Sequence, residues 1–268
     1  MRHAAGGTVI GNRKKRKQMD GSKDIKVRKK KKRKKKNYLL RLILLICIGV
    51  CLYFFFTSSL FDINEIAVEN NDYYTPEQII SIAGAITGGN TFAERTGAMK
   101  DKLLEDPYIK NASVSRKLPD GLVITVQERK EAAYVVYRSE YVIIDSDGIV
   151  LRKAKVEPKL TVMEGMTVKK IETGEPLEAE ENAMLTGTLS LLKQMEEQEL
   201  YFKRITFSSV VIKAYIYDSL ICEATPENLS AGMPQLKEVI TDLYSKGIER
   251  GVIKMGSDGY FAFSPLPE

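Results

Sequence analysis

The sequence predicts an α+β protein: a single transmembrane helix, a βααββ domain, and a β-rich mixed domain with two helices. Three observations carry this prediction. Residues 42–61 form a run of 20 without a charged side chain. Apolar residues alternate with others at 122–127 and 210–217, which is the period of half-buried strands. Apolar residues also recur at helical spacing within 79–86 and 185–195.

The net charge of +6 is distributed very unevenly along the 268 residues. Residues 1–37 hold 17 Lys and Arg against two Asp, whereas the chain after Arg41 holds 23 Lys and Arg against 33 Asp and Glu. Because like charges repel, residues 1–37 are predicted to form a disordered basic tail. Its longest basic run includes Lys29, Lys30, Lys31, Lys32, Arg33, Lys34, Lys35 and Lys36.

Three interpretations of this basic run compete. Its place beside the apolar run makes it a topology determinant, since positive flanks stay in the cytoplasm. The same position favours contact with anionic lipid, at about 1 kcal/mol per basic residue near the surface. Nucleic-acid binding is disfavoured, because no aromatic residue is interleaved with the charges and no recognition fold accompanies them.

The apolar run predicts a transmembrane helix at residues 38–60. Twenty helical residues span about 30 Å, the thickness of the hydrocarbon core of a bilayer. The basic flank predicts a single-pass type II membrane protein, with a cytoplasmic N terminus and the remaining domains outside the cell. A cleaved signal peptide is disfavoured, because the run is too long and too aromatic.

Residues 61–129 are predicted to fold as strand, helix, helix, strand, strand. The first strand covers 61–68. Thr75 and Gln78 predict a capping box that opens the first helix. A second capping box is expected at 91–94, with Phe92 on the apolar stripe of the second helix.

This order and these residues resemble the POTRA domain of the FtsQ/DivIB family of bacterial cell-division proteins. The most specific combination is a Leu118-Pro119-Asp120 turn, then a strand, then Glu128-Arg129. Further matching residues are Phe61, Ile63, Ile66, Val68-Glu69-Asn70, Asn90-Thr91-Phe92, Pro107, Ala112, Val114, Arg116 and Ile124.

Residues 130–268 are predicted to form the β domain of that family. Asp147-Gly148 predicts a hairpin turn, and this interpretation is preferred to a Ca²⁺ loop, which would need further carboxylates. Residues 164–182 are expected to be loop. A helix capped by Thr225 is expected to bury Met233, Leu236 and Leu243, before closing strands at 251–255 and 259–264.

No catalytic, metal or cofactor site is predicted. The one histidine, His3, lies in the tail, which excludes histidine-based triads and the usual zinc sites. The chain has no phosphate-binding glycine motif and no GxSxG elbow. A small-molecule substrate is therefore not expected, and a membrane-tethered hydrolase would need a constellation that is not visible. A glycosidase-type carboxylate pair stays open, with solvated helix faces favoured for the acidic runs.

The resemblance implies a non-enzymatic scaffold at the division septum. It would join single-span division proteins resembling FtsL and DivIC/FtsB and help to control septal peptidoglycan synthases. The alternative is a POTRA-bearing envelope-assembly or translocation component, which would require a downstream barrel. As the resemblance implies, the partner would add a strand at the last strands of the chain. The predicted partner-binding residues are Tyr260, Phe261, Ala262, Phe263, Leu236 and Tyr244.

Overall fold

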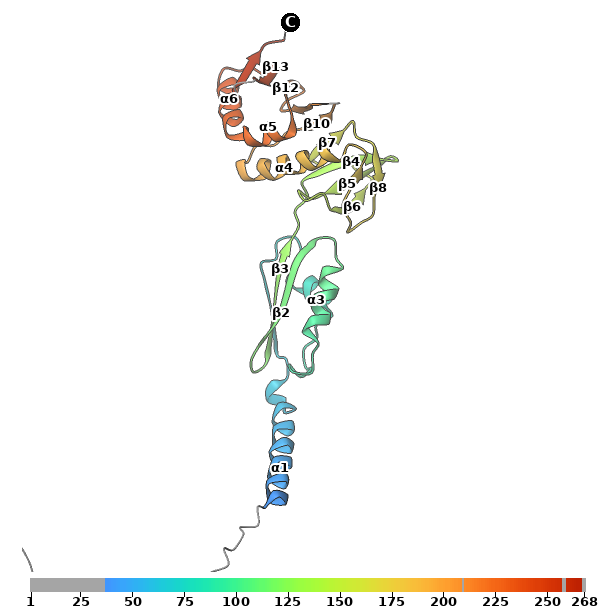
Figure 1. The fold of residues 1–268 in the computed structure, drawn as a ribbon, viewed down its shortest axis with the longest axis vertical. Helices are drawn as coiled ribbons and strands as arrows, with labels where there is room; N and C mark the ends of the chain where they lie inside the picture. The colour runs from blue at the N-terminus through green and yellow to red at the C-terminus, as the bar shows by residue number, and fades with distance from the viewer. Residues whose placement is uncertain (1–36, 209, 257–258, 267–268) are drawn as a thin grey trace, which may run out of the picture. The chain divides into compact units, whose positions relative to one another are not determined.

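The structure is a computed structural model that describes residues 37–208, 210–256 and 259–266. The basic run at 29–36 lies outside the described residues. The predicted fold class is confirmed: an apolar helix is followed by a βααββ region and then by a β-rich sheet with helices (Figure 1).

Helix α1 (Tyr38–Phe56) is the apolar helix. Its 19 residues measure about 28 Å at 1.5 Å per residue, which is long enough to cross a bilayer. This length and composition are consistent with a single-pass membrane anchor. The helix ends four residues before the predicted position, because Thr57 and Ser58 donate their hydroxyls to the carbonyls of Tyr53 and Phe55. A short 3-10 turn, η1 (Ser59–Phe61), follows it.

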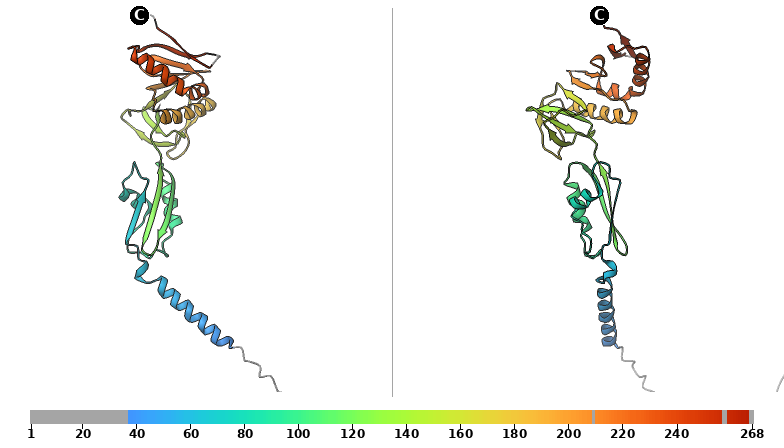
Figure 2. Two further views of the ribbon diagram at one scale, coloured as in Figure 1. Left: turned by 90° about the vertical axis from the view of Figure 1, so that its left-hand side faces the viewer. Right: turned by 180° about the vertical axis from the view of Figure 1, so that it is seen from behind.

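The βααββ region forms a three-stranded sheet in the order β1-β3-β2. Strand β1 runs parallel to β3, and β2 runs antiparallel to it. Two helices cover one face of the sheet and share a core with it that includes Ile63, Ile79, Leu103, Leu122 and Ile124. The β2–β3 turn and the α2–α3 loop lie at the same end of this sheet in both views of Figure 2. The elements are β1 (Glu65–Glu69), α2 (Pro76–Ala83), α3 (Thr96–Leu104), β2 (Ile109–Lys117) and β3 (Gly121–Glu128).

The two predicted helix starts have opposite outcomes. The capping box at α2 is confirmed, with Thr75 and Gln78 each accepting the other's backbone N–H. The second capping box is wrong, because α3 begins at Thr96, five residues beyond Thr91. The hydroxyl of Thr91 is fully buried and donates instead to the carbonyl of Phe61, at 2.7 Å.

The second half of the chain forms a nine-stranded sheet in the order β14-β13-β12-β11-β10-β7-β4-β5-β6. Three of its pairings are parallel and require crossovers: β4 with β7, β7 with β10, and β12 with β13. The strands are β4 (Ala133–Tyr137), β5 (Glu140–Ile144), β6 (Val150–Ala154), β7 (Thr161–Glu164), β10 (Arg204–Phe207), β11 (Ile212–Tyr215), β12 (Ser219–Ala224), β13 (Arg250–Met255) and β14 (Phe261–Ser264).

Helices α4 (Asn182–Gln198), α5 (Pro226–Ala231) and α6 (Met233–Ser245) share one hydrophobic core with this sheet. The predicted cap at Thr225 is confirmed, since its hydroxyl accepts the N–H of Asn228. The single helix expected after it is instead broken into α5 and α6 at Gly232. The expected loop at 164–182 contains a small hairpin of β8 (Val168–Lys170) and β9 (Glu178–Ala179).

Candidate functional site

Strand β14 lies at one edge of the nine-stranded sheet, where β13 is its neighbour among the described strands. In the hairpin, Gly256 donates its N–H to the carbonyl of Tyr260, at 2.8 Å. Hydrogen-bonded and non-hydrogen-bonded pairs alternate along antiparallel strands, so the pair of Lys254 and Ala262 is also a bonded one. The backbone N–H and C=O groups of Phe261 and Phe263 therefore point away from β13, toward the open edge.

Two glycines allow the aromatic side chains of β14 to pack closely. A Cβ added at Gly232, just before α6, would lie 2.8 Å from the ring of Phe261. A Cβ added at Gly251 would clash with the ring of Phe263 and lie 2.8 Å from the carbonyl oxygen of Ser264. Both rings are half-buried against the core. The side chains thus hold β14 in place, and among the described strands none pairs with its outer backbone groups.

The opposite face of this edge carries a row of charges. Ala262 is exposed and lies opposite Lys254 on β13. Lys254 in turn lies opposite Glu223 on β12. Glu223 lies 3.1 Å from Lys254 and 3.3 Å from Lys213. Hydrogen bonds from these lysines, first from Lys254, hold the pKa of Glu223 below its usual value despite partial burial. Two lysines share one carboxylate here, so this row ends at the open edge with excess positive charge.

The other predicted partner-binding residues fall into two groups. Tyr260 and Tyr244 are 73% and 66% exposed. Leu236, on α6 itself, has no exposed surface, and its side chain is part of the hydrophobic core. Leu236 therefore supports this part of the domain from within, and its side chain is not available to a partner.

The far edge of the sheet, β6, differs from β14 in being partly covered. Val150 donates its N–H to Glu175 and accepts the N–H of Gly174, at 3.0 and 2.8 Å. The rest of β6 carries Arg152 and Lys153, and charged side chains discourage added strands. Strand β14, in contrast, consists of Phe, Ala, Phe and Ser without a charge.

A cluster of charged residues joins β3 to the nine-stranded sheet. Arg129 lies 2.6 Å from Asp145 and 3.2 Å from Asp147. Asp147 also lies 2.7 Å from Lys110 and 2.8 Å from Lys193. Hydrogen bonds from Lys110 and then Lys193 lower the pKa of Asp147 to about 2. The predicted turn at Asp147-Gly148 is confirmed, since the Asp145 carboxylate accepts the N–H groups of Asp147 and Ile149.

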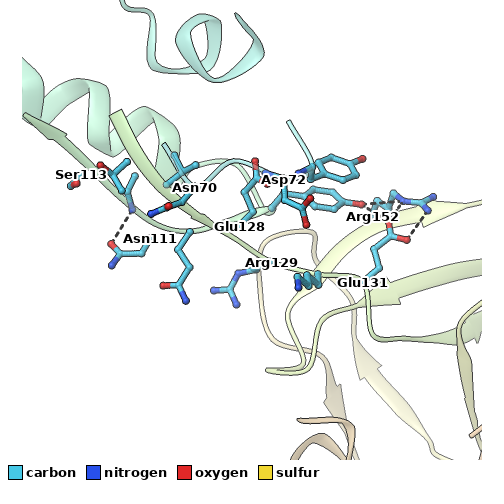
Figure 3. A pocket seen from close by; sticks show the side chains of 15 residues that line it. Asn70, Asp72, Asn111, Ser113, Glu128, Arg129, Glu131 and Arg152 are labelled. Carbon is cyan, nitrogen blue, oxygen red and sulfur yellow. Dashed lines mark hydrogen bonds and ion pairs between the residues drawn. The ribbon is translucent and has the colours of Figure 1, made fainter. Parts of the chain in front are cut away.

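A second polar group lies beside this cluster, along a cavity of about 990 Å³ (Figure 3). Tyr108 donates its hydroxyl to Glu131 at 2.6 Å, and Arg152 donates to the same carboxylate at 2.7 Å. Burial alone would raise the pKa of Glu131, but the hydrogen bonds from Arg152 and Tyr108 outweigh it and lower that pKa. Burial, with the bond to Glu131, raises the pKa of Tyr108, so the phenol stays protonated. The ring of Tyr73 stacks on Tyr108 at 4.2 Å.

These clusters were not predicted from the sequence, because their members come from separate strands, turns and helices. Their short ion pairs and hydrogen bonds fit a structural junction, and in the contacts described above no nucleophile is paired with a base. No cluster of three His, Cys, Asp or Glu residues suited to a metal occurs in the described ranges. Cys222 is fully buried, and desolvation raises the pKa of its thiol to about 12, which makes it unreactive.

Comparison with known proteins gives consistent matches. Residues 61–129 match the family model described as POTRA domain, FtsQ-type. The chain is 30% identical over 185 residues to cell division protein DivIB of Clostridium acetobutylicum, covering 67% of this chain and 74% of that protein. It is 24% identical over 205 residues to DivIB of Clostridium botulinum (strain Hall), covering 74% of this chain and 80% of that protein.

A solved structure also matches part of the chain. It is the major extracytoplasmic domain of the trans isomer of the cell division protein DivIB from Geobacillus stearothermophilus. The match covers 44% of this chain and 97% of that one, at 15% identity and a TM-score of 0.30.

Proposed function

Because the chain belongs to the FtsQ/DivIB family of bacterial cell-division proteins, we propose that it is a non-enzymatic scaffold of the division machinery at the septum. Residues 61–129 and 130–268 would be its two working modules outside the membrane. It would join single-span proteins resembling FtsL and DivIC/FtsB and help to control septal peptidoglycan synthases. Helix α1 would be the anchor of a type II membrane protein, with the basic run at 29–36 fixing the cytoplasmic side.

The observation that carries the partner-binding part is the open edge of β14. Phe261 and Phe263 direct their backbone groups outward, and in the described part of the chain β14 has neither the charges nor the cover found at β6. A partner strand would pair with these groups, so main-chain hydrogen bonds would supply affinity. The excess lysine charge beside Ala262 would favour an acidic residue on the added strand.

Proline at position 263 tests this proposal, with alanine at the same position as its matched control. Phe263→Pro and Phe263→Ala both remove the ring, but only proline removes the outward N–H. Proline at Ala262 would be less informative, because that N–H faces β13. Losing one main-chain hydrogen bond costs about 1 kcal/mol, so Phe263→Pro is expected to bind the partner roughly five-fold more weakly than Phe263→Ala.

The assay is capture of the DivIC/FtsB-like partner by the full chain in detergent, with circular dichroism showing that both variants fold. Equal capture by the proline and alanine variants would rule out strand addition at β14. The septal role is tested separately by imaging a fluorescent fusion in dividing cells. We expect a band at midcell, and a uniform envelope signal would reject the division scaffold.

A further inference from the structure

Four phenylalanines pack the end of α1 into the three-stranded domain. The ring of Phe92, from the α2–α3 loop, lies 5.0 Å from that of Phe56 and 5.0 Å from that of Phe61. Phe55 and Phe61 are 5.2 Å apart. These three contacts are edge-to-face, the arrangement that aromatic pairs prefer. The side chain of Asn90 also donates to the carbonyl of Phe56, at 2.9 Å.

Hydrogen bonds hold two loops of the domain against the same segment. The N–H and the hydroxyl of Thr91 both donate to the carbonyl of Phe61, at 2.7 Å each. Gly88 donates to Ile63 at 2.8 Å, which fixes the α2–α3 loop. Asn64 donates to Asp120 at 2.8 Å, which fixes the β2–β3 turn. The end of the domain at which α1 enters is thus built from residues 57–64 and these two loops.

This end exposes large apolar side chains. Leu60 is 55% exposed, Ile86 65%, Phe92 40% and Leu118 57%. We call these four residues the apolar rim. They come from η1, the α2–α3 loop and the β2–β3 turn, so they are far apart in sequence and gathered by the contacts above. The neighbouring Arg116 is already engaged, because it donates to the carbonyls of Thr91 and Glu94.

We propose that the apolar rim docks on the outer surface of the bilayer that α1 crosses. This inference rests on the proposed role of α1 as a membrane anchor. The uncharged run ends at Phe61, and the headgroup layer extends about 5–8 Å beyond the hydrocarbon core. Phe92 contacts Phe56, the last residue of α1, so its ring lies within that layer. Aromatic and aliphatic side chains are stabilised there by burial in the interface.

The rim consists of apolar residues, and the nearby Lys117 is paired with Glu65 at 3.3 Å. Docking is therefore driven by apolar burial, so zwitterionic phosphatidylcholine suffices and added salt has little effect. A partner protein is the rival occupant of the rim. If the rim serves a protein partner or stays in water, we expect it not to contact lipid when the chain is reconstituted alone.

The test uses the absence of tryptophan from the chain, which makes any introduced tryptophan a unique reporter. The full chain is reconstituted in phosphatidylcholine vesicles whose acyl chains are brominated near the carbonyl or, for the mid-membrane position Leu52, near the chain ends, and fluorescence is compared with that in unbrominated vesicles. The rim variants are Leu118→Trp and Ile86→Trp, both at exposed positions that need no repacking. Leu52→Trp, within α1, reports on the anchor, and Val156→Trp, at a 79% exposed position in the β6–β7 loop, is the aqueous control.

We expect both rim tryptophans to lose most of their emission in brominated vesicles, at low and at high salt, while Val156→Trp keeps its emission. If Leu52→Trp is quenched but both rim variants behave like Val156→Trp, the docking proposal is overturned and the anchor stands. If Leu52→Trp is not quenched either, the anchor fails and docking fails with it.

Discussion

Replacing Arg129 by Met is expected to destabilise the junction between β3 and the β5–β6 turn by about 2–3 kcal/mol. The side chains of Arg129 and Asp145 are 17% and 5% exposed and lie 2.6 Å apart. Removing one partner of a buried ion pair costs about 3–5 kcal/mol, because the other charge is left unpaired. Asp145 would keep two backbone N–H donors, from Asp147 and Ile149. The expected cost is therefore at or below the lower limit of that range of about 3–5 kcal/mol, at about 2–3 kcal/mol.

Lys110→Met is the matched control, since it removes another cation from the same cluster. The Lys110 side chain is 44% exposed, so its ion pair with Asp147 is worth about 0.2–1 kcal/mol. The assay is urea unfolding followed by circular dichroism, with amide hydrogen exchange in β5 and β6 to localise the change. Adding Asp145→Asn to Arg129→Met should recover part of the loss by removing the unpaired charge. Equal and small losses for Arg129→Met and Lys110→Met would refute this reasoning.

Three further predictions follow from packing and charge. Gly251→Ala places a Cβ against the β14 ring and is expected to cost about 1–3 kcal/mol and to weaken partner capture, whereas Gly97→Ala, where an added Cβ meets nothing within 4 Å, should not weaken capture. Leu236→Ala should cost about 2–5 kcal/mol in urea unfolding, and Tyr244→Ala, at an exposed position, less than about 0.5 kcal/mol. The pKa of Asp147 is lowered to about 2, so its contribution is present above the ordinary value of 3.8 and is lost as pH falls toward 2. Screening by solvent leaves roughly 1 kcal/mol of that contribution, and Asp147→Asn should flatten the loss of stability between these pH values.

Local structure could be predicted where side chain and backbone interact within a few residues. Thr75 and Gln78 cap α2 as their spacing requires. The same pattern at 91–94 failed, because Thr91 is tied to Phe61, thirty residues earlier in the chain. The break of the last long helix at Gly232 has a local cause instead: Pro234, at the start of α6, lacks the N–H that a continuous helix would bond to the carbonyl of Ser230. At Thr91, therefore, a long-range contact decided the local conformation.

Predicting the candidate site from the sequence was harder, because the site depends on the order and register of distant strands. The resemblance placed Phe261 and Phe263 at a sheet edge, but the direction of their backbone groups follows only from the β13–β14 register. The parallel pairings that bring β7 between β4 and β10 have no local signal in the sequence. The cluster around Asp147 likewise joins residues from β2, α4 and the end of β3. Such groups become visible only once the sheet order is known.

The two edges of the nine-stranded sheet give the strongest reason to regard β14 as an interaction surface. An open strand is a liability, and natural sheets protect it with charge, proline, a bulge or a covering segment. At β6 the protection is present: residues 174–176 cover its start, and Arg152 and Lys153 follow. At β14 the rings of Phe261 and Phe263 pack closely against glycines, which fixes the strand. No residue of the strand carries a charge that would disfavour pairing at its outer backbone groups. Since β14 is held firmly and carries no charge of its own, it is the edge that we propose for the addition of a partner strand.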